Sequence, residues 1–148
     1  MPGWMMLCLD ASFLFNLITR RLTSEHAALW ERWVVEQRPM IAPLLMRYEI
    51  ANTLNKWRRK AAIDEQTVQR GMSDIVALPI RFLDDDRLPF EALALARDLD
   101  LSATYDAHYV ALAARYGADL WTSDHRLWVK THPQFDWVHY APERLPAT

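Results

Sequence analysis

Four carboxylates in this chain occupy positions from which one fold could gather them at a single site. They are Asp10, Glu49, Asp106 and Asp124. Four negative charges near one point repel one another and destabilise a fold unless a cation neutralises them. Ligand sets made only of oxygen suit Mg²⁺ and Mn²⁺ better than Zn²⁺, and such ions commonly act on phosphates. These residue types therefore predict a divalent metal site for phosphate chemistry.

Two of the four acids come at or shortly after the end of a short, mostly apolar run. Residues 5–9 are apolar and end at Asp10, and Asp124 comes shortly after a second run at 118–121. Such runs are typical of buried strands in a parallel sheet, whose carboxyl edge is where open α/β sheets bind ligands. The alternative for both residues is a purely structural role as the N-cap of the helix that follows.

The other two acids lie on predicted helices. Glu49 falls about two turns into a helix expected over 43–60, beside the apolar stripe of that helix. Asp106 is in the first turn of a helix expected over 104–116, and it shares a face with the apolar Val110. Residues four apart on a helix lie on one face, so both carboxylates are expected to point inward.

The remaining periodicity predicts the elements that position these acids. Further helices are expected at 12–20, from Thr23 to just before Pro39, and at 63–77, 89–99 and 124–129, and further strands at 40–42, 79–83 and 135–138. Strands separated by one or two helices imply a parallel sheet that is covered on both faces. We therefore predict an α/β fold, a three-layer α/β/α sandwich with a central, mostly parallel sheet.

Size and composition predict a single domain. The chain has 148 residues, of which 51% are hydrophobic and 24% charged, which is enough for one sizeable core at about 5–138, with a tail at about 140–148 expected to be a surface extension. One cysteine, no signal-like N-terminus and no long apolar run favour a cytoplasmic protein that does not contact a membrane. A net charge of −2 gives no overall attraction for nucleic acid, although a local basic patch can still bind phosphate.

Taken in order, the segments around the four acids resemble the successive signatures of PIN-domain nucleases, and more narrowly the VapC-type toxins of type II toxin–antitoxin pairs. The segments are Asp10-Ala11-Ser12 and residues 48–54, 105–113 and 122–127, and the resemblance covers roughly residues 5–138. It implies a metal-dependent endoribonuclease with Mg²⁺ (or Mn²⁺) as cofactor. It also implies an RNA substrate, a cognate antitoxin protein and a homodimer.

The resemblance also implies a role for each acid. Asp10 and Asp106 would be direct metal ligands, Glu49 would bind metal or orient the attacking water, and Asp124 would act directly or through water. Supporting hydroxyl and amide groups near the metal would come from Ser12, Asn52, Thr122 and Ser123.

Several features allow a second interpretation. Trp57, Arg58, Arg59 and Lys60 could hold RNA by stacking and charge, or could simply be a core tryptophan and the cations favoured at a helix C-terminus. The apolar stripe Leu29, Trp30, Trp33 and Val34 could pack into the core or, as in the resembled family, contact an antitoxin or a second subunit.

Two alternatives to the nuclease remain open. One is a non-catalytic PIN-like module that binds RNA or protein without cutting. The other is a phosphotransfer enzyme with Asp10 as nucleophile, which is disfavoured because Ser12 stands where such phosphatases carry a second Asp.

Overall fold

Five short strands form one sheet at the centre of the molecule. The computed structural model describes residues 5–145. The strands are β1 (Leu7–Leu9), β2 (Met40–Pro43), β3 (Ile80–Leu83), β4 (Asp119–Thr122) and β5 (Val138–Tyr140). Every pairing within the sheet is parallel, and the strand order is β3-β2-β1-β4-β5. The predicted α/β class with a parallel central sheet is confirmed.

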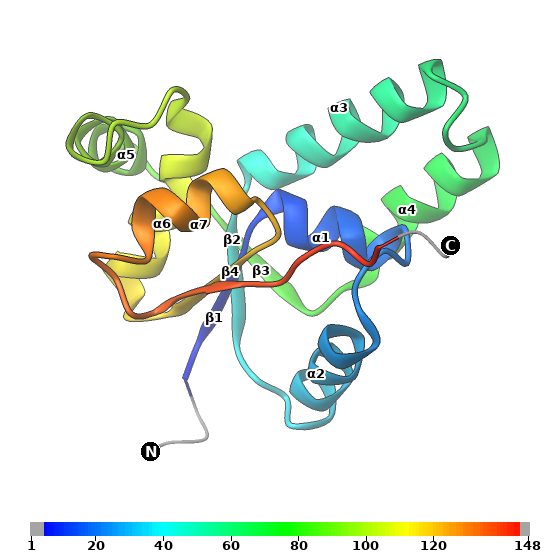
Figure 1. Cartoon of the computed structure of the whole chain (residues 1–148), viewed down its shortest axis with the longest axis horizontal. Coiled ribbons are helices and arrows are strands. Elements are labelled where there is room, and N and C mark those ends of the chain that lie inside the picture. Colours follow the sequence, from blue (N-terminus) through cyan, green and yellow to red (C-terminus); the bar gives the residue numbers. More distant parts are fainter. Residues whose placement is uncertain (1–4, 146–148) are drawn as a thin grey trace.

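Helices cover both faces of this sheet. They are α1 (Ala11–Ile18), α2 (Ser24–Val35), α3 (Leu45–Arg59), α4 (Glu65–Ala77), α5 (Leu88–Asp98), α6 (Thr104–Tyr116) and α7 (His125–Thr131). Figure 1 shows α5, α6 and α7 on one side of the strands and α1 to α4 on the other, which is the predicted three-layer arrangement. Within residues 5–145, no helix is both long and apolar enough to cross a membrane.

Local chemistry determines where several helices begin and end. Four helices start after a residue whose side chain accepts a hydrogen bond from a backbone amide in the first turn: Asp10, Thr23, Asp64 and Asp124. Such caps satisfy amides that have no partner within the helix. At the other end of α6, Gly117 adopts the left-handed conformation with φ 61°, which glycine reaches without a steric penalty.

The strand order reverses at β1. From β1 the chain builds β2 and β3 on one side, and it later returns to place β4 and β5 on the other. The Asp10 amide donates to the Trp121 carbonyl at 3.1 Å, which ties the carboxyl end of β1 to β4. Ligands of open α/β sheets bind outside the carboxyl ends of the strands where the strand order reverses in this way. The carboxyl ends of β1 and β4 are therefore the expected place for a site.

Two predicted boundaries are wrong. The last strand is β5 at Val138–Tyr140 and not 135–138, because the Phe135 amide bonds back to the Thr131 carbonyl at 3.0 Å and residues 136–137 form a turn. Pro43 does not open the third helix but ends β2, where it pairs with Leu83 of β3.

The first residue after β5 packs into the domain, whereas Glu143, Arg144 and Leu145 are exposed on its surface. Ala141 is fully buried, and its amide donates to the Thr122 carbonyl at 2.8 Å, which extends the β4–β5 pairing by one residue. Glu143 then forms an antiparallel bridge with Leu22. Residues 146–148 of the predicted tail and residues 1–4 lie outside the described residues.

Candidate active site

A cleft of about 380 Å³ contains all four predicted acids. Asp10 reaches it from the end of β1, Glu49 from α3, Asp106 from α6 and Asp124 from the loop after β4. Among the described residues, no Lys or Arg lines this cleft. The structure thus brings together four carboxylates that are far apart in the sequence and leaves them without a lining cation.

The Asp10 carboxylate is buried and held in one orientation. Its Oδ1 accepts hydrogen bonds from the Phe13 amide at 2.9 Å and from the Ser12 hydroxyl at 2.7 Å, so these bonds do not engage Oδ2. Burial, together with the negative charge of Asp106, raises the pKa of Asp10 to about 7, although both hydrogen bonds act in the opposite direction. Asp10 is therefore both a helix cap and an acid that is costly to ionise.

Ser12 joins the start of α1 to the loop that carries Asp124. Its hydroxyl donates to Asp10 and accepts from the Ser123 amide at 2.9 Å, and it lies 3.3 Å from the Thr122 hydroxyl. Thr122 is fully buried, and its hydroxyl accepts from the Asp124 amide at 2.9 Å. Three of the four predicted supporting residues thus connect the two strand-end acids.

Glu49 is oriented by a tyrosine from another helix. The Tyr109 hydroxyl donates to Glu49 Oε1 at 2.7 Å, and Tyr109 itself is almost completely buried. Partial burial raises the pKa of Glu49, whereas the hydrogen bond from Tyr109 lowers it. Because the buried Tyr109 hydroxyl fixes Oε1 of Glu49, the position of Oε2 on the same carboxylate is restricted as well.

Asp106 is the electrostatic centre of the cluster. Burial raises its pKa to about 6, with further contributions from the charges of Asp124 and Glu49, and Asp106 in turn raises the pKa of Asp10. It is thus coupled to each of the other three acids. Asp124 lies at the edge of the cluster, where its Oδ1 caps α7 by accepting from the Arg126 amide at 2.9 Å.

Some residues proposed from the sequence do not reach the cleft. Asn52 is exposed and Thr53 lines the cleft in its place, because on a helix the fourth residue after Glu49 lies closer to its direction than the third. Arg58, Arg59 and Lys60 are also exposed and do not line it. Asn52, which was expected to support the metal site, therefore does not line the cleft.

Trp57 does line the cleft, together with residues that the sequence did not single out. Arg21 places its guanidinium 4.2 Å from the centre of the Trp57 ring and forms an ion pair with Glu143 at 3.2 Å, and Glu143 lines the cleft as a fifth carboxylate. Tyr109 was detectable in principle, because it lies three residues after Asp106 on the same face of a helix. Glu143 carried no such signal, since only the packed C-terminal segment brings it to the site.

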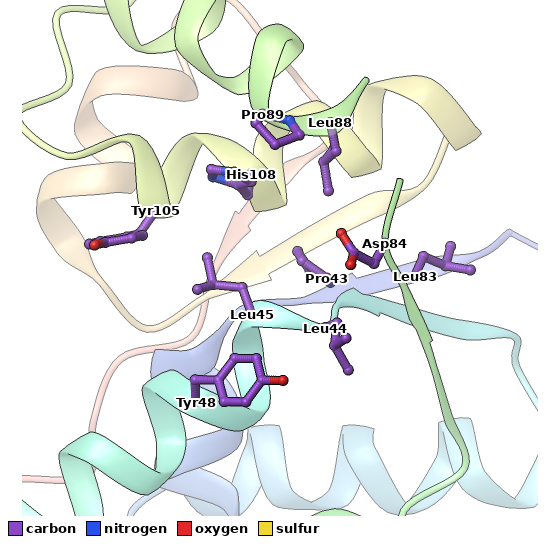
Figure 2. A pocket seen from close by; sticks show the side chains of 10 residues that line it. All are labelled: Pro43, Leu44, Leu45, Tyr48, Leu83, Asp84, Leu88, Pro89, Tyr105 and His108. Atoms are coloured by element: carbon purple, nitrogen blue, oxygen red, sulfur yellow. The ribbon is translucent and has the colours of Figure 1, made fainter. Parts of the chain in front are cut away.

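Figure 2 shows a second pocket, of about 260 Å³. It is lined by Pro43, Leu44, Leu45, Tyr48, Leu83, Asp84, Leu88, Pro89, Tyr105 and His108. Tyr48 and His108 are sequence neighbours of cleft-lining residues, so α3 and α6 contribute adjacent faces to both spaces. With Asp84 as its single carboxylate, this pocket has apolar rather than metal-binding character.

The donor groups of the acid cleft fit a hydrated divalent cation. Among residues 5–145, no three Asp, Glu, His or Cys side chains form a ready-made metal cage. Mg²⁺, however, usually keeps several waters and binds through one or two carboxylates. The side-chain oxygen of Ser123, a residue of the cleft lining, is buried without a hydrogen-bond partner among the described residues.

Comparison with known protein families identifies the type of domain that contains this cleft. Residues 7–131 match the model of the family described as PIN domain, a range that includes all four acids. The chain belongs to the PIN-domain family. Comparison with curated proteins found no matching relative of this PIN domain.

Solved structures show the same fold. A crystal structure of PAE2754 from Pyrobaculum aerophilum is 27% identical, with a TM-score of 0.64 over 87% of this PIN domain and 86% of that chain. A toxin–antitoxin complex from Klebsiella pneumoniae is 18% identical, with a TM-score of 0.62 over 90% and 95%. VapBC2 from Rickettsia felis, bound to a DNA fragment from its promoter, is 12% identical, with a TM-score of 0.62 over 93% and 99%.

Proposed function

We propose that this PIN domain is a metal-dependent endoribonuclease that acts as the toxin of a toxin–antitoxin pair. The observation that carries the proposal is the convergence of four carboxylates from four separate elements in one cleft, with Asp106 coupled to the other three. Such a cluster is unfavourable unless a cation neutralises it. Membership in the PIN-domain family supports the same conclusion.

The residues of the cleft have separate roles in this proposal. Asp10 and Asp106 hold Mg²⁺ or Mn²⁺, Asp124 binds it directly or through water, and Glu49 binds it or accepts a hydrogen bond from the attacking water. A bound ion of this kind lowers the pKa of a water ligand and neutralises the charge that develops on the leaving 3′-oxygen. The hydrogen bonds from Ser12 to Asp10 and from Tyr109 to Glu49 keep both carboxylates in place.

Exposed apolar residues near the second pocket support the proposal that this PIN domain binds protein partners. Tyr48 is 66% exposed and Tyr105 is 58% exposed beside the pocket of Figure 2, and Phe90 and Leu93 of the nearby α5 are exposed as well. Clustered apolar surface often marks an interface. We propose an antitoxin and a second copy of this chain as partners, acting in the cytoplasm. A short reading frame immediately upstream that encodes a small DNA-binding protein would support the antitoxin.

The structure gives less support to two other surfaces that the sequence suggested, the apolar stripe of α2 and the proposed RNA contacts at residues 57–60. On α2, Trp33 belongs to the core, Leu29 and Trp30 pack partly against it, and Val34 stays exposed, so most of that apolar stripe is explained by packing. For RNA, Trp57 remains a proposed contact inside the cleft, and Arg58, Arg59 and Lys60 remain proposed contacts only outside it.

Removal of divalent ions tests the enzymatic proposal. Purified protein is incubated with an end-labelled RNA in millimolar Mg²⁺ or Mn²⁺, in EDTA, and in EDTA followed by excess ion. We expect internal cleavage products with either ion, none in EDTA, and full recovery on readdition, because the carboxylates need a cation to bind a phosphodiester. No cleavage and no Mn²⁺ binding by calorimetry would instead favour a non-catalytic binding module. Transfer of a phosphoryl group to Asp10 would favour the phosphotransfer enzyme.

Replacing Tyr109 by Phe tests how the chain orients Glu49. The change removes the hydroxyl that donates to Glu49 Oε1 and leaves the buried ring in place. We expect cleavage to slow about 10-fold, as is typical when a group that orients a metal-site carboxylate is lost. The acidic limb of the pH–rate profile should also move to higher pH, because the hydrogen bond lowers the pKa of Glu49.

The matched control for this variant is Tyr116→Phe, at a half-exposed position near the end of the same helix. It should leave the cleavage rate and the pH profile unchanged. Equal behaviour of the two variants would show that Tyr109 has no positioning role.

A further inference from the structure

A groove of about 550 Å³ continues from the acid cleft over the other side of Asp106 and Asp124. Both carboxylates line the cleft as well as the groove, so the two spaces meet at these residues. The rest of the groove is formed by residues 100–102 and by α7. A linear polymer bound across the four acids can therefore extend into this groove.

The groove differs from the cleft in its charge. Arg126 and Lys130 line the groove, whereas the described lining of the cleft contains no Lys or Arg. Their spacing of four residues places both cations on the same face of α7. The exposed His125 lies beside them. Two cations thus lie next to the carboxylate cluster, in a groove whose lining also includes Asp100.

Both cations are available to a ligand. Lys130 is paired with Asp100 at 3.4 Å, but the side chain of Asp100 is 98% exposed, and an ion pair between exposed side chains is weak. Arg126 is exposed and takes part in none of the ion pairs found among residues 5–145. A phosphate can replace Asp100 on Lys130 and find an unengaged guanidinium one turn away.

We propose that this groove binds the backbone phosphates of the RNA strand on one side of the cleaved bond. The inference rests on the proposed function and extends it to the path of the substrate. Carboxylates repel every phosphate that a metal ion does not screen, so the phosphates next to the cleaved bond need cations from the protein. Arg126 and Lys130 meet that need at the point where the strand leaves the acids. Leu101, Leu127 and Val129 give the groove apolar walls against which sugars and bases can pack.

Steady-state cleavage of a single-stranded RNA by the double variant Arg126→Ala/Lys130→Ala tests this inference. We expect KM to rise 5- to 20-fold and kcat to stay within about twofold, because the groove holds substrate and does not touch the reacting atoms. The slope of log KM against log salt concentration should shrink by about 1.4, which is about 0.7 for each lost phosphate contact on a single strand. The variant Arg126→Lys, which keeps both positive charges of the groove, should have a KM close to that of the wild type.

The control is Arg70→Ala/Arg81→Ala, which removes the same charge from two exposed positions on α4 and β3 that line neither space. Its KM and salt slope should match those of the wild type. Values for the groove variant that equal those of the control would overturn the inference, and so would a fall in kcat at constant KM.

Binding without turnover separates this inference from the proposed function. Wild-type protein that cuts no RNA would contradict the proposed function. The groove is then tested by the fluorescence anisotropy of a labelled RNA in the Asp10→Asn background with Mn²⁺ present. At least fivefold weaker binding by the groove variant than by the control supports the groove, and equal binding refutes it.

Discussion

Asp106→Asn is expected to lower the rate of RNA cleavage at least about 1,000-fold while leaving the fold intact. Asp106 is coupled to the other three acids, so under the proposed function its loss removes a metal ligand that the other three acids surround. A bound metal supplies several kcal/mol of transition-state stabilisation, and each 1.4 kcal/mol corresponds to a factor of 10 in rate. Cleavage of an end-labelled RNA in Mn²⁺ measures the effect, with circular dichroism as the check on folding.

The matched control is Asp98→Asn, at an exposed position near the end of α5. It removes the same charge and should cut RNA at the wild-type rate. Cleavage by Asp106→Asn within 10-fold of the wild type would contradict the assignment of Asp106 as a metal ligand. Loss of cleavage in both variants would point to a general effect of charge rather than to the site.

Asp10→Asn is expected to stabilise the metal-free protein at pH 8 by roughly 4 kcal/mol, which is the cost of ionising a carboxyl group whose pKa lies near 7 instead of 3.8. Asparagine is as good an N-cap as aspartate, and its side-chain oxygen can still accept from the Phe13 amide. The variant therefore removes the buried charge and keeps the start of α1. Urea unfolding in EDTA measures the difference.

The sign of this effect follows from proton binding. Between about pH 4 and pH 7, folded protein keeps a proton on Asp10 that the unfolded chain has already released. The free energy of unfolding of the metal-free wild type should therefore fall as pH rises through this range and level off above it. The stability advantage of Asp10→Asn should be small at pH 4 and grow to its full value by pH 8.

Asp64→Asn provides the control for the cap. Asp64 caps α4 in the same way, through the Thr67 amide at 2.8 Å, but this carboxylate is exposed and its pKa is lowered by the hydrogen bonds with Thr67. Its replacement should not stabilise the protein at any pH. A pH-independent gain in Asp10→Asn, or an equal gain in Asp64→Asn, would show that burial of the Asp10 charge is not the cause.

Local features of the sequence were enough to predict most elements of the fold. Apolar runs of three to five residues predicted the strands, and Asp10, Thr23 and Asp124 marked the starts of helices because their side chains replace missing partners of first-turn amides. The last strand was misplaced because Phe135 and Trp137 are as apolar as strand residues but belong to turns that follow α7. Hydrophobicity alone does not distinguish these two conformations.

The sequence by itself determined which acids are present and that each lies at a strand end or on an inward helix face. Only the tertiary structure decided that β1 is flanked by β2 and β4, which places Asp10 next to the Asp124 loop. It also paired Glu49 with Tyr109 and brought Glu143 to the cleft. The physical reason is that periodicity reports the direction of a side chain relative to its own element, whereas strand order and helix packing depend on contacts between residues far apart in the chain. The four acids of the candidate site could therefore be predicted from local pattern, whereas the coupling of Asp106 to the other three could not.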